Sequence, residues 1–156
     1  MLADAGSSVL LNGADYVLNS GLDVAADQTA SLLGAWSTTG ALHVSGGTLN
    51  LGGNMTTAGL NLPSFVRTGG TVNVVGALNN TGDTLLLDHD TGTWTLDGGT
   101  LTGGSLDFAD GQTLTMSHDA DNRLTGVTVN GDLDLSADDA RLTIAGGTTF
   151  HNAHLS

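Results

Sequence analysis

Thr93–Met116, which reads TWTLDGGTLTGGSLDFADGQTLTM, is the stretch that decides the fold. Apolar residues alternate with small polar ones, and this period of two places one set of side chains inward and the other outward on a strand. Turns of two or three residues built on Gly or Asp interrupt the alternation every four or five residues. The pattern predicts very short strands joined by tight corners, which we interpret as one coil of a β-solenoid.

Two sequence units recur outside this stretch. Residues 22–32 align with residues 106–116, and Leu133–Asp139 opens a looser third copy. A repeat of roughly 20 to 30 residues is typical of stacked supersecondary units and predicts six or seven coils in this chain. The second recurring unit is the tripeptide Gly-Gly-Thr, whose copies are unevenly spaced. We attribute this uneven spacing to a longer loop at residues 79–83, and we place Pro63 at a corner. This second unit, Gly-Gly-Thr, occurs at residues 46–48, 69–71, 98–100 and 146–148, with steps of 23, 29 and 48 residues.

The repeats favour one all-β domain over residues 1–156, in which parallel coils lie about 4.8 Å apart and bury a continuous ladder of aliphatic side chains. An antiparallel β-sandwich is the alternative, because it also has short strands and turns every 8 to 12 residues. We favour the solenoid because a sandwich has no reason to repeat its sequence. The chain stops without a polar closing element, so we expect a fragment or stacking subunit of a larger assembly.

Composition narrows the classes of partner. All 16 acidic residues are Asp and the three basic residues are Arg, which gives a net charge of −13. Such a surface repels nucleic acid and anionic membranes. The absence of Cys excludes disulfides, thiolate metal sites and Cys catalysis. No apolar run approaches membrane-spanning length, so we expect no membrane insertion.

Residues 46–53 (GGTLNLGG) and 109–117 (ADGQTLTMS) resemble the degenerate repeats of bacterial autotransporter passenger regions and of filamentous-haemagglutinin-like surface adhesins. The resemblance covers about residues 22–156. It implies a right-handed parallel β-helix that is exported to the cell surface and acts as a stalk or adhesive fibre.

Closely spaced carboxylates suggest a calcium site at Asp83, Asp88 and Asp90, because Ca²⁺ prefers oxygen ligands in a Gly-containing turn. Asp119-Ala-Asp-Asn122 is a second candidate. The alternative for both is an acidic corner that faces water, and we expect no obligatory cofactor. His151 and His154 form a weak candidate metal pair, because no third ligand type lies nearby.

Two further patterns, paired carboxylates and repeated outward Thr residues, bear on catalysis and on ice binding. Paired carboxylates such as Asp132 and Asp134 suit glycoside hydrolysis, but the Gly-His-Gly and Arg-x-Lys motifs of polygalacturonase-like β-helices are missing, so we expect no enzyme. Ranks of outward Thr would suit ice binding, but the uneven steps between pairs predict that they lie on several faces. We expect Trp94 in the core and leave Trp36 open. The Thr and Asn pairs are Thr48/Asn50, Thr71/Asn73, Thr93/Thr95, Thr100/Thr102, Thr113/Thr115 and Thr128/Asn130.

These observations together predict a non-enzymatic structural or adhesive β-solenoid of an extracellular bacterial surface protein or fibre. Its partners would be other copies of itself, flanking repeats, or host or matrix glycans. The alternatives are a subunit that polymerises end to end, a β-helix that binds or cleaves polysaccharides, and an ice-binding solenoid.

Overall fold

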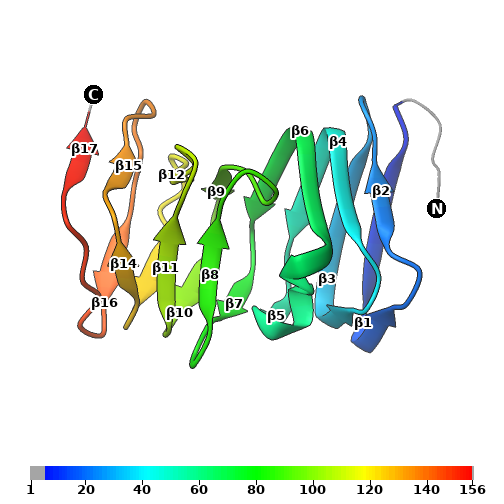
Figure 1. Ribbon diagram of the computed structural model, residues 1–156, viewed down its shortest axis with the longest axis horizontal. Coiled ribbons are helices and arrows are strands. Elements are labelled where there is room, and N and C mark those ends of the chain that lie inside the picture. The colour runs from blue at the N-terminus through cyan, green and yellow to red at the C-terminus, as the bar shows by residue number, and fades with distance from the viewer. Residues whose placement is uncertain (1–5, 156) are drawn as a thin grey trace.

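The computed structural model describes residues 6–155, which wind into a parallel β-helix of about seven turns (Figure 1). Every strand pair in this part of the chain is parallel, which confirms the solenoid and excludes the antiparallel sandwich. Paired residues lie between 19 positions (Thr29 and Thr48) and 24 positions (Ser45 and Gly69) apart.

Each coil contributes short strands to three faces, and the long early strands bend across two of them. The first face contains the strands β1 (Ser8–Leu18), β3 (Thr29–Thr38), β4 (Leu42–Leu51), β6 (Phe65–Val74), β9 (Trp94–Leu96), β12 (Leu114–Met116), β15 (Leu133–Leu135) and β17 (Ala153–Leu155). The second face contains the ends of β1 and β3, then β5 (Asn54–Thr56), β7 (Ala77–Asn79), β10 (Thr100–Thr102), β13 (Arg123–Thr125) and β16 (Thr143–Ala145). The third face contains β2 (Leu22–Val24), the starts of β4 and β6, and then β8 (Thr84–Leu87), β11 (Ser105–Phe108) and β14 (Thr128–Asn130).

Equivalent apolar side chains stack in columns along the interior, as the alternation predicts. Trp94 is completely buried, and its ring centroid lies 5.3 Å from that of Phe65. Burying such columns removes apolar surface from water and supplies the main drive for stacking. One column of the first face consists of Leu11, Leu32, Leu51, Val74, Leu96 and Met116. One column of the second face consists of Met55, Leu78, Leu101 and Leu124, and Ile144 extends it in register but is partly exposed.

Glycines let successive coils approach closely at the corner between the first and second faces. Gly34 pairs with Gly13 and has a φ of 81°, and Gly53 lies against Gly34 with a φ of 68°. A Cβ atom at Gly34 would collide with the Gly13 backbone. Only glycine adopts this left-handed conformation without strain while leaving room for the neighbouring coil.

Two fully buried asparagines also connect adjacent coils, Asn80 at the corner between the second and third faces and Asn122 at the corner between the first and second faces. Asn80 accepts a hydrogen bond from Thr57 Oγ1 at 2.6 Å, and its amide donates to the carbonyls of Gly103 at 3.3 Å and Ser105 at 2.7 Å. Asn122 likewise accepts from the Gly98 N–H at 2.7 Å. Its amide also donates to the carbonyls of Ser117 and Arg141. These side chains satisfy backbone groups that a corner would otherwise bury unpaired.

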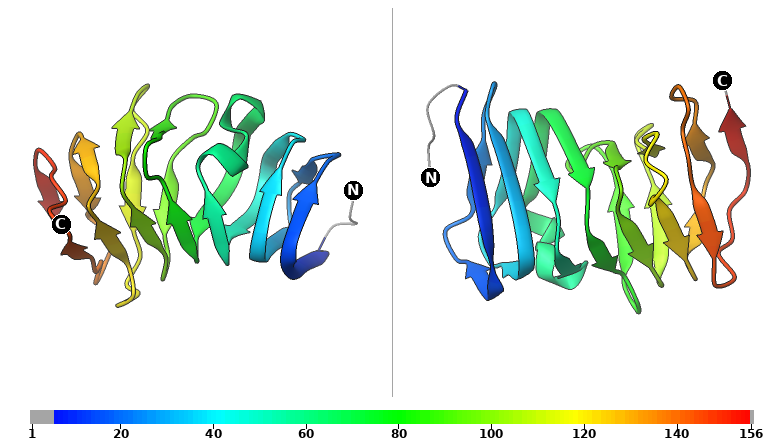
Figure 2. Two further views of the ribbon diagram at one scale, coloured as in Figure 1. Left: turned by 90° about the horizontal axis from the view of Figure 1, so that it is seen from below. Right: turned by 180° about the vertical axis from the view of Figure 1, so that it is seen from behind.

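The regular stack is interrupted between β5 and β6. Two 3₁₀ turns lie there, η1 (Ala58–Leu60) and η2 (Leu62–Ser64), and Pro63 occupies a first-turn position of η2. The corner predicted at Pro63 is therefore confirmed. β3 and β5 pair only at Ala35 and Asn54, and on the third face β8 pairs with β11 but with no strand of the preceding coil. The pairing is thus broken beside the turns on two faces, between β3 and β5 on the second face and between β6 and β8 on the third (Figures 1 and 2).

The Gly-Gly-Thr step of 29 residues has a different cause from the predicted longer loop. Residues 46–47 and 69–70 stack at the entrance to the first face, whereas residues 98–99 lie at the entrance to the second face, against Val74. The corner at residues 80–83 is indeed longer than the corner at residues 103–104 of the next coil. The uneven step nevertheless arises because the same tripeptide is used at two different corners.

Candidate functional site

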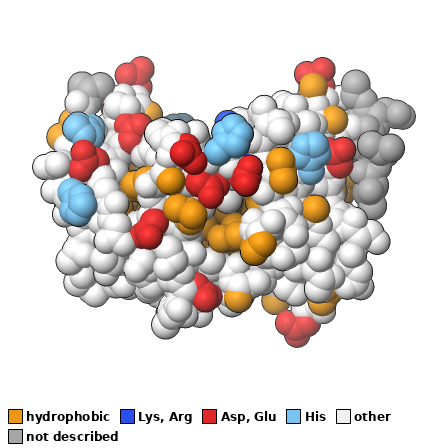
Figure 3. Space-filling view, viewed as in Figure 1, with side chains coloured by type: hydrophobic (Ala, Val, Ile, Leu, Met, Phe, Trp, Pro, Cys, Tyr) orange, Lys and Arg blue, Asp and Glu red, His pale blue; other side chains and the backbone are white. Residues whose placement is uncertain are grey.

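The clearest surface feature of the third face is a groove between the 3₁₀ turns and β8. It has a volume of about 600 Å³. Leu62, Pro63 and the half-exposed Leu86 provide apolar surface, and Asp83 and Asp90 also line the groove. In Figure 3 hydrophobic side chains gather in a hollow of this face with acidic side chains around them. We call this feature the third-face groove.

Asp88, which also lines the third-face groove, holds the turn that follows β8. Its Oδ1 accepts hydrogen bonds from the N–H of Asp90 at 3.0 Å, the N–H of Thr91 at 3.1 Å and the hydroxyl of Thr91 at 3.1 Å. The backbone N–H of Thr91 contributes most to lowering the pKa of Asp88 below its usual value. The carboxylate is therefore ionised at neutral pH and already engaged in shaping the loop.

The structure brings the three predicted calcium residues to one groove without joining their carboxylates in one ligand set. Asp83, Asp88 and Asp90 all line the third-face groove. Among residues 6–155 there is no group of three acidic or His side chains placed to hold a metal ion. In the second candidate, Asp119 Oδ1 accepts a hydrogen bond from the N–H of Asp121 at 2.8 Å, which again shapes a turn. Calcium binding stays a prediction that needs a direct measurement.

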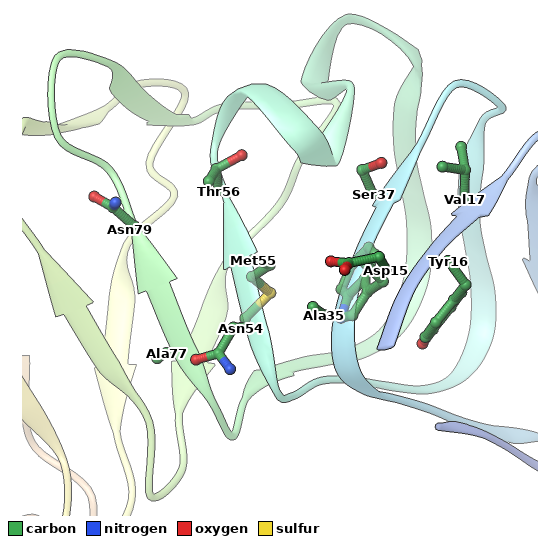
Figure 4. Close-up of a pocket in the computed structure, with 11 residues that line it drawn as sticks. Asp15, Tyr16, Val17, Ala35, Ser37, Asn54, Met55, Thr56, Ala77 and Asn79 are labelled. Carbon is green, nitrogen blue, oxygen red and sulfur yellow. The ribbon is translucent and has the colours of Figure 1, made fainter. Parts of the chain in front are cut away.

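A second groove, of about 490 Å³, lies on the second face where β3 and β5 separate. Figure 4 shows its side chains on neighbouring strands, with Asn54 and Thr56 on β5 and Asp15 on β1. Trp36 lies beneath it, is 6% exposed, and donates from Nε1 to the carbonyl of Gly52 at 2.9 Å. Trp36 is thus a core residue like Trp94, and it does not offer an exposed ring for sugar stacking.

The outward positions of the first face form two polar ranks. Thr29, Thr48 and Thr71 pair directly in one rank, and Thr93 and Thr113 continue it, with the Thr113 N–H donating to Thr93 Oγ1 at 3.2 Å. The second rank is Ser31, Asn50, Asn73, Thr95 and Thr115.

Neighbouring side chains of this second rank also bond to each other, because Asn73 Nδ2 donates to Asn50 Oδ1 at 3.0 Å and the hydroxyls of Thr95 and Thr115 lie 3.0 Å apart. The six Thr and Asn pairs do lie on several faces as predicted, because Thr100/Thr102 lie on the second face and Thr128/Asn130 on the third. The prediction missed that the other four pairs are in register on one face. The pairs Thr48/Asn50, Thr71/Asn73, Thr93/Thr95 and Thr113/Thr115 share the first face.

The remaining predicted residues are placed at the C-terminal coils. Asp132 accepts hydrogen bonds from Asn152 Nδ2 at 3.0 Å and lies 2.9 Å from His154 Nε2. The hydrogen bond with His154 is the largest cause that lowers the pKa of Asp132. Asp134 instead accepts a hydrogen bond from the N–H of Ser136. The two carboxylates thus have separate local partners, Asp132 just before β15 and Asp134 within it.

Comparison of this chain with protein-family models, with curated proteins and with solved structures gives no match. Within residues 6–155, no helix has the length and apolarity that crossing a membrane requires. The physical features of the molecule therefore carry the functional argument.

Sequence reasoning missed both grooves and the role of Asn80. The grooves exist because strands lack partners in an adjacent coil, and no local motif encodes a missing partner. Two sequence signals were present, namely the loss of strict alternation over residues 57–64 and the single proline in that stretch.

Proposed function

We propose that this chain is a structural, non-enzymatic segment of an extracellular bacterial surface protein, whose stacked coils form a stiff stalk or adhesive fibre. The observation that carries the proposal is the pairing of the first face, which runs through every coil from β1 to β17 without a missing partner. Backbone hydrogen bonds along the long axis give a rod whose coils each support only their neighbours.

Surface chemistry supports the same role. The negative charge comes entirely from Asp, which keeps a long surface protein soluble through mutual repulsion. The sequence resemblance to repeats of autotransporter passengers and filamentous-haemagglutinin-like adhesins points in the same direction. Host or matrix glycans, other copies of the chain or flanking repeats are the proposed partners, and contacts would use the faces and corners rather than the interior.

Single-molecule pulling between the two ends tests the mechanical role. One coil holds about 21 residues, so peeling one coil should release about 7 nm of chain at about 3.5 Å per residue. We expect repeated steps of this size at sustained force. Extension without resistance would refute a load-bearing role. A glycan array, together with assays for reducing ends released from acidic polysaccharides, tests the adhesive role and the alternative of a polysaccharide-active β-helix.

Ice binding is a second candidate, and one observation favours it. The two polar ranks of the first face present Thr, Ser and Asn at a regular spacing of about 4.8 Å per coil. From Thr29 to Thr115 these ranks contain no charged residue. Thermal hysteresis and ice-crystal shaping would test this candidate, with Thr71→Lys as the variant that interrupts the array. Hysteresis that is absent, or that survives Thr71→Lys, removes the candidate.

A further inference from the structure

The third face contains an open strand edge in a binding groove. β8 is the terminal strand of the three-stranded sheet β14–β11–β8, and the preceding coil presents η1 and η2 beside it instead of a strand. An edge strand exposes N–H and C=O groups that can pair with another extended segment. The third-face groove, about 600 Å³ in volume, lies along this edge.

The hydrogen bonds with β11 show which backbone groups of β8 are free to face the groove. Ser105 N–H donates to the Asp83 carbonyl at 3.0 Å and Ala109 N–H donates to the Leu87 carbonyl at 2.9 Å. Residues at odd positions of β8 therefore point their backbone groups toward β11, and Thr84 and Leu86 point theirs to the other side. The Leu86 carbonyl already accepts a hydrogen bond from the Thr91 hydroxyl at 3.1 Å, and Thr91 lines the same groove. The groups of β8 left for a partner are therefore the N–H and C=O of Thr84 and the N–H of Leu86.

The walls of the groove define the chemistry of its occupant. Leu62 and Pro63 form an apolar wall opposite β8, and the side chain of Leu86 is 38% exposed. Asp83 and Asp90 also line the groove, in a chain whose net charge is −13. These features suit an extended peptide in which apolar side chains alternate with basic ones.

We infer that the third-face groove binds an extended, basic peptide segment of a partner protein, which adds to β8 as a fourth strand of the β14–β11–β8 sheet. The main chain of the peptide pairs with the N–H and C=O of Thr84 and with the N–H of Leu86. Its apolar side chains contact Leu62 and Leu86, and its basic side chains face the carboxylates of Asp83 and Asp90. This inference does not depend on the mechanical role proposed above, because the stacked coils would form a rod with or without a bound peptide.

Fluorescence anisotropy with a labelled Lys-Val-Lys-Val-Lys-Val peptide, capped at both ends, tests the inference on the full chain. We expect saturable binding that weakens as salt is raised. Methylating the peptide amides that face β8 should weaken binding about fivefold for each main-chain hydrogen bond lost. The Glu-Val analogue should not bind.

Two variants separate backbone pairing from charge. Thr84→Pro removes an N–H that faces the groove at the first residue of a strand, where proline is tolerated, and should weaken binding at least fivefold. Asp83→Asn with Asp90→Asn should weaken binding and flatten its dependence on salt. Asp121→Asn with Asp138→Asn is the matched control, because it removes the same charge from exposed sites elsewhere and should leave binding unchanged.

Unfolding midpoints of all variants establish that each remains folded. Absence of binding by the Lys-Val peptide overturns the inference. The inference is also overturned if the N-methylated peptide binds the native chain, and the Lys-Val peptide binds Thr84→Pro, as tightly as the Lys-Val peptide binds the native chain. The attraction would then come from charge alone. Equal binding of the Glu-Val analogue contradicts the role of Asp83 and Asp90.

Discussion

Replacing Asn80 by Ala removes the side chain that joins three successive coils at one corner. Asn80 is 0% exposed and makes three side-chain hydrogen bonds, one with Thr57 in the preceding coil and two with Gly103 and Ser105 in the following coil. Each contributes about 1 kcal/mol net, and each partner left unpaired in the interior adds a desolvation cost. We therefore expect the Asn80→Ala variant to lose about 3 to 5 kcal/mol of unfolding free energy, a large share of the stability of a typical domain.

Asn79→Ala is the matched control for this measurement. Asn79 is the preceding residue and is exposed, and its Oδ1 accepts one local hydrogen bond, from the N–H of Thr81 at 3.0 Å. Its loss should cost less than about 1 kcal/mol. Urea unfolding followed by circular dichroism measures both variants. A similar shift of the midpoint in both would refute the reasoning that the buried asparagine braces the coils.

Three further predictions follow from the corners and the acidic turn. Gly34→Ala should destabilise the protein by more than about 1 kcal/mol, because Gly34 has a positive φ and faces the Gly13 backbone, and a thermal midpoint equal to that of the native chain would contradict this. The pKa of Asp88 is lowered in the folded protein, so the Asp88 carboxylate stabilises the turn fully above about pH 4, and this stabilisation is lost as the pH falls through the folded-state pKa. An NMR titration of the Asp88 carboxyl with a midpoint at or above the usual Asp value would contradict this prediction. EDTA should leave the unfolding midpoint unchanged, because the carboxylates at the third-face groove do not form one ligand set. If calcium instead raised the unfolding midpoint, and Asp90→Asn abolished this rise, a calcium site would be established.

The sequence predicted the architecture because each coil repeats the same physical problem. Leu101, Leu106 and Leu114 lie on three successive faces of one coil, and in each case an alternating triplet places the leucine inside. The Gly and Asp corners between them set the length of each side. These are local signals, so they could be interpreted without knowing which coils are neighbours.

The position of each coil relative to its neighbours could not be predicted in the same way. The four Gly-Gly-Thr units look equivalent in sequence, yet residues 98–99 occupy a different corner from residues 46–47. For the same reason the sequence did not reveal that four Thr and Asn pairs are in register on the first face, because register along the axis depends on the length of every intervening corner.

The candidate sites show the same contrast between local sequence signals, which could be interpreted, and the placement of neighbouring coils, which could not. Grouping Asp83, Asp88 and Asp90 from their closeness in sequence correctly placed them in one region, and all three line the third-face groove. The free edge of β8 depends instead on η1 and η2, which lie about one coil earlier in the chain. The surface open to a partner is thus a tertiary property of two segments, neither of which carries a recognisable binding motif.

Distances between nitroxide labels along one outward column of the first face test the stacking of coils most directly, and the absence of native Cys makes the labelling selective. Leu10, Ser31, Thr115 and His154 belong to this column, in which consecutive members pair from coil to coil. Four pairing steps separate Ser31 from Thr115 and seven separate Leu10 from His154, so at about 4.8 Å per step we predict about 19 Å and about 34 Å. Distances that do not grow with the number of coils would contradict a parallel β-helix.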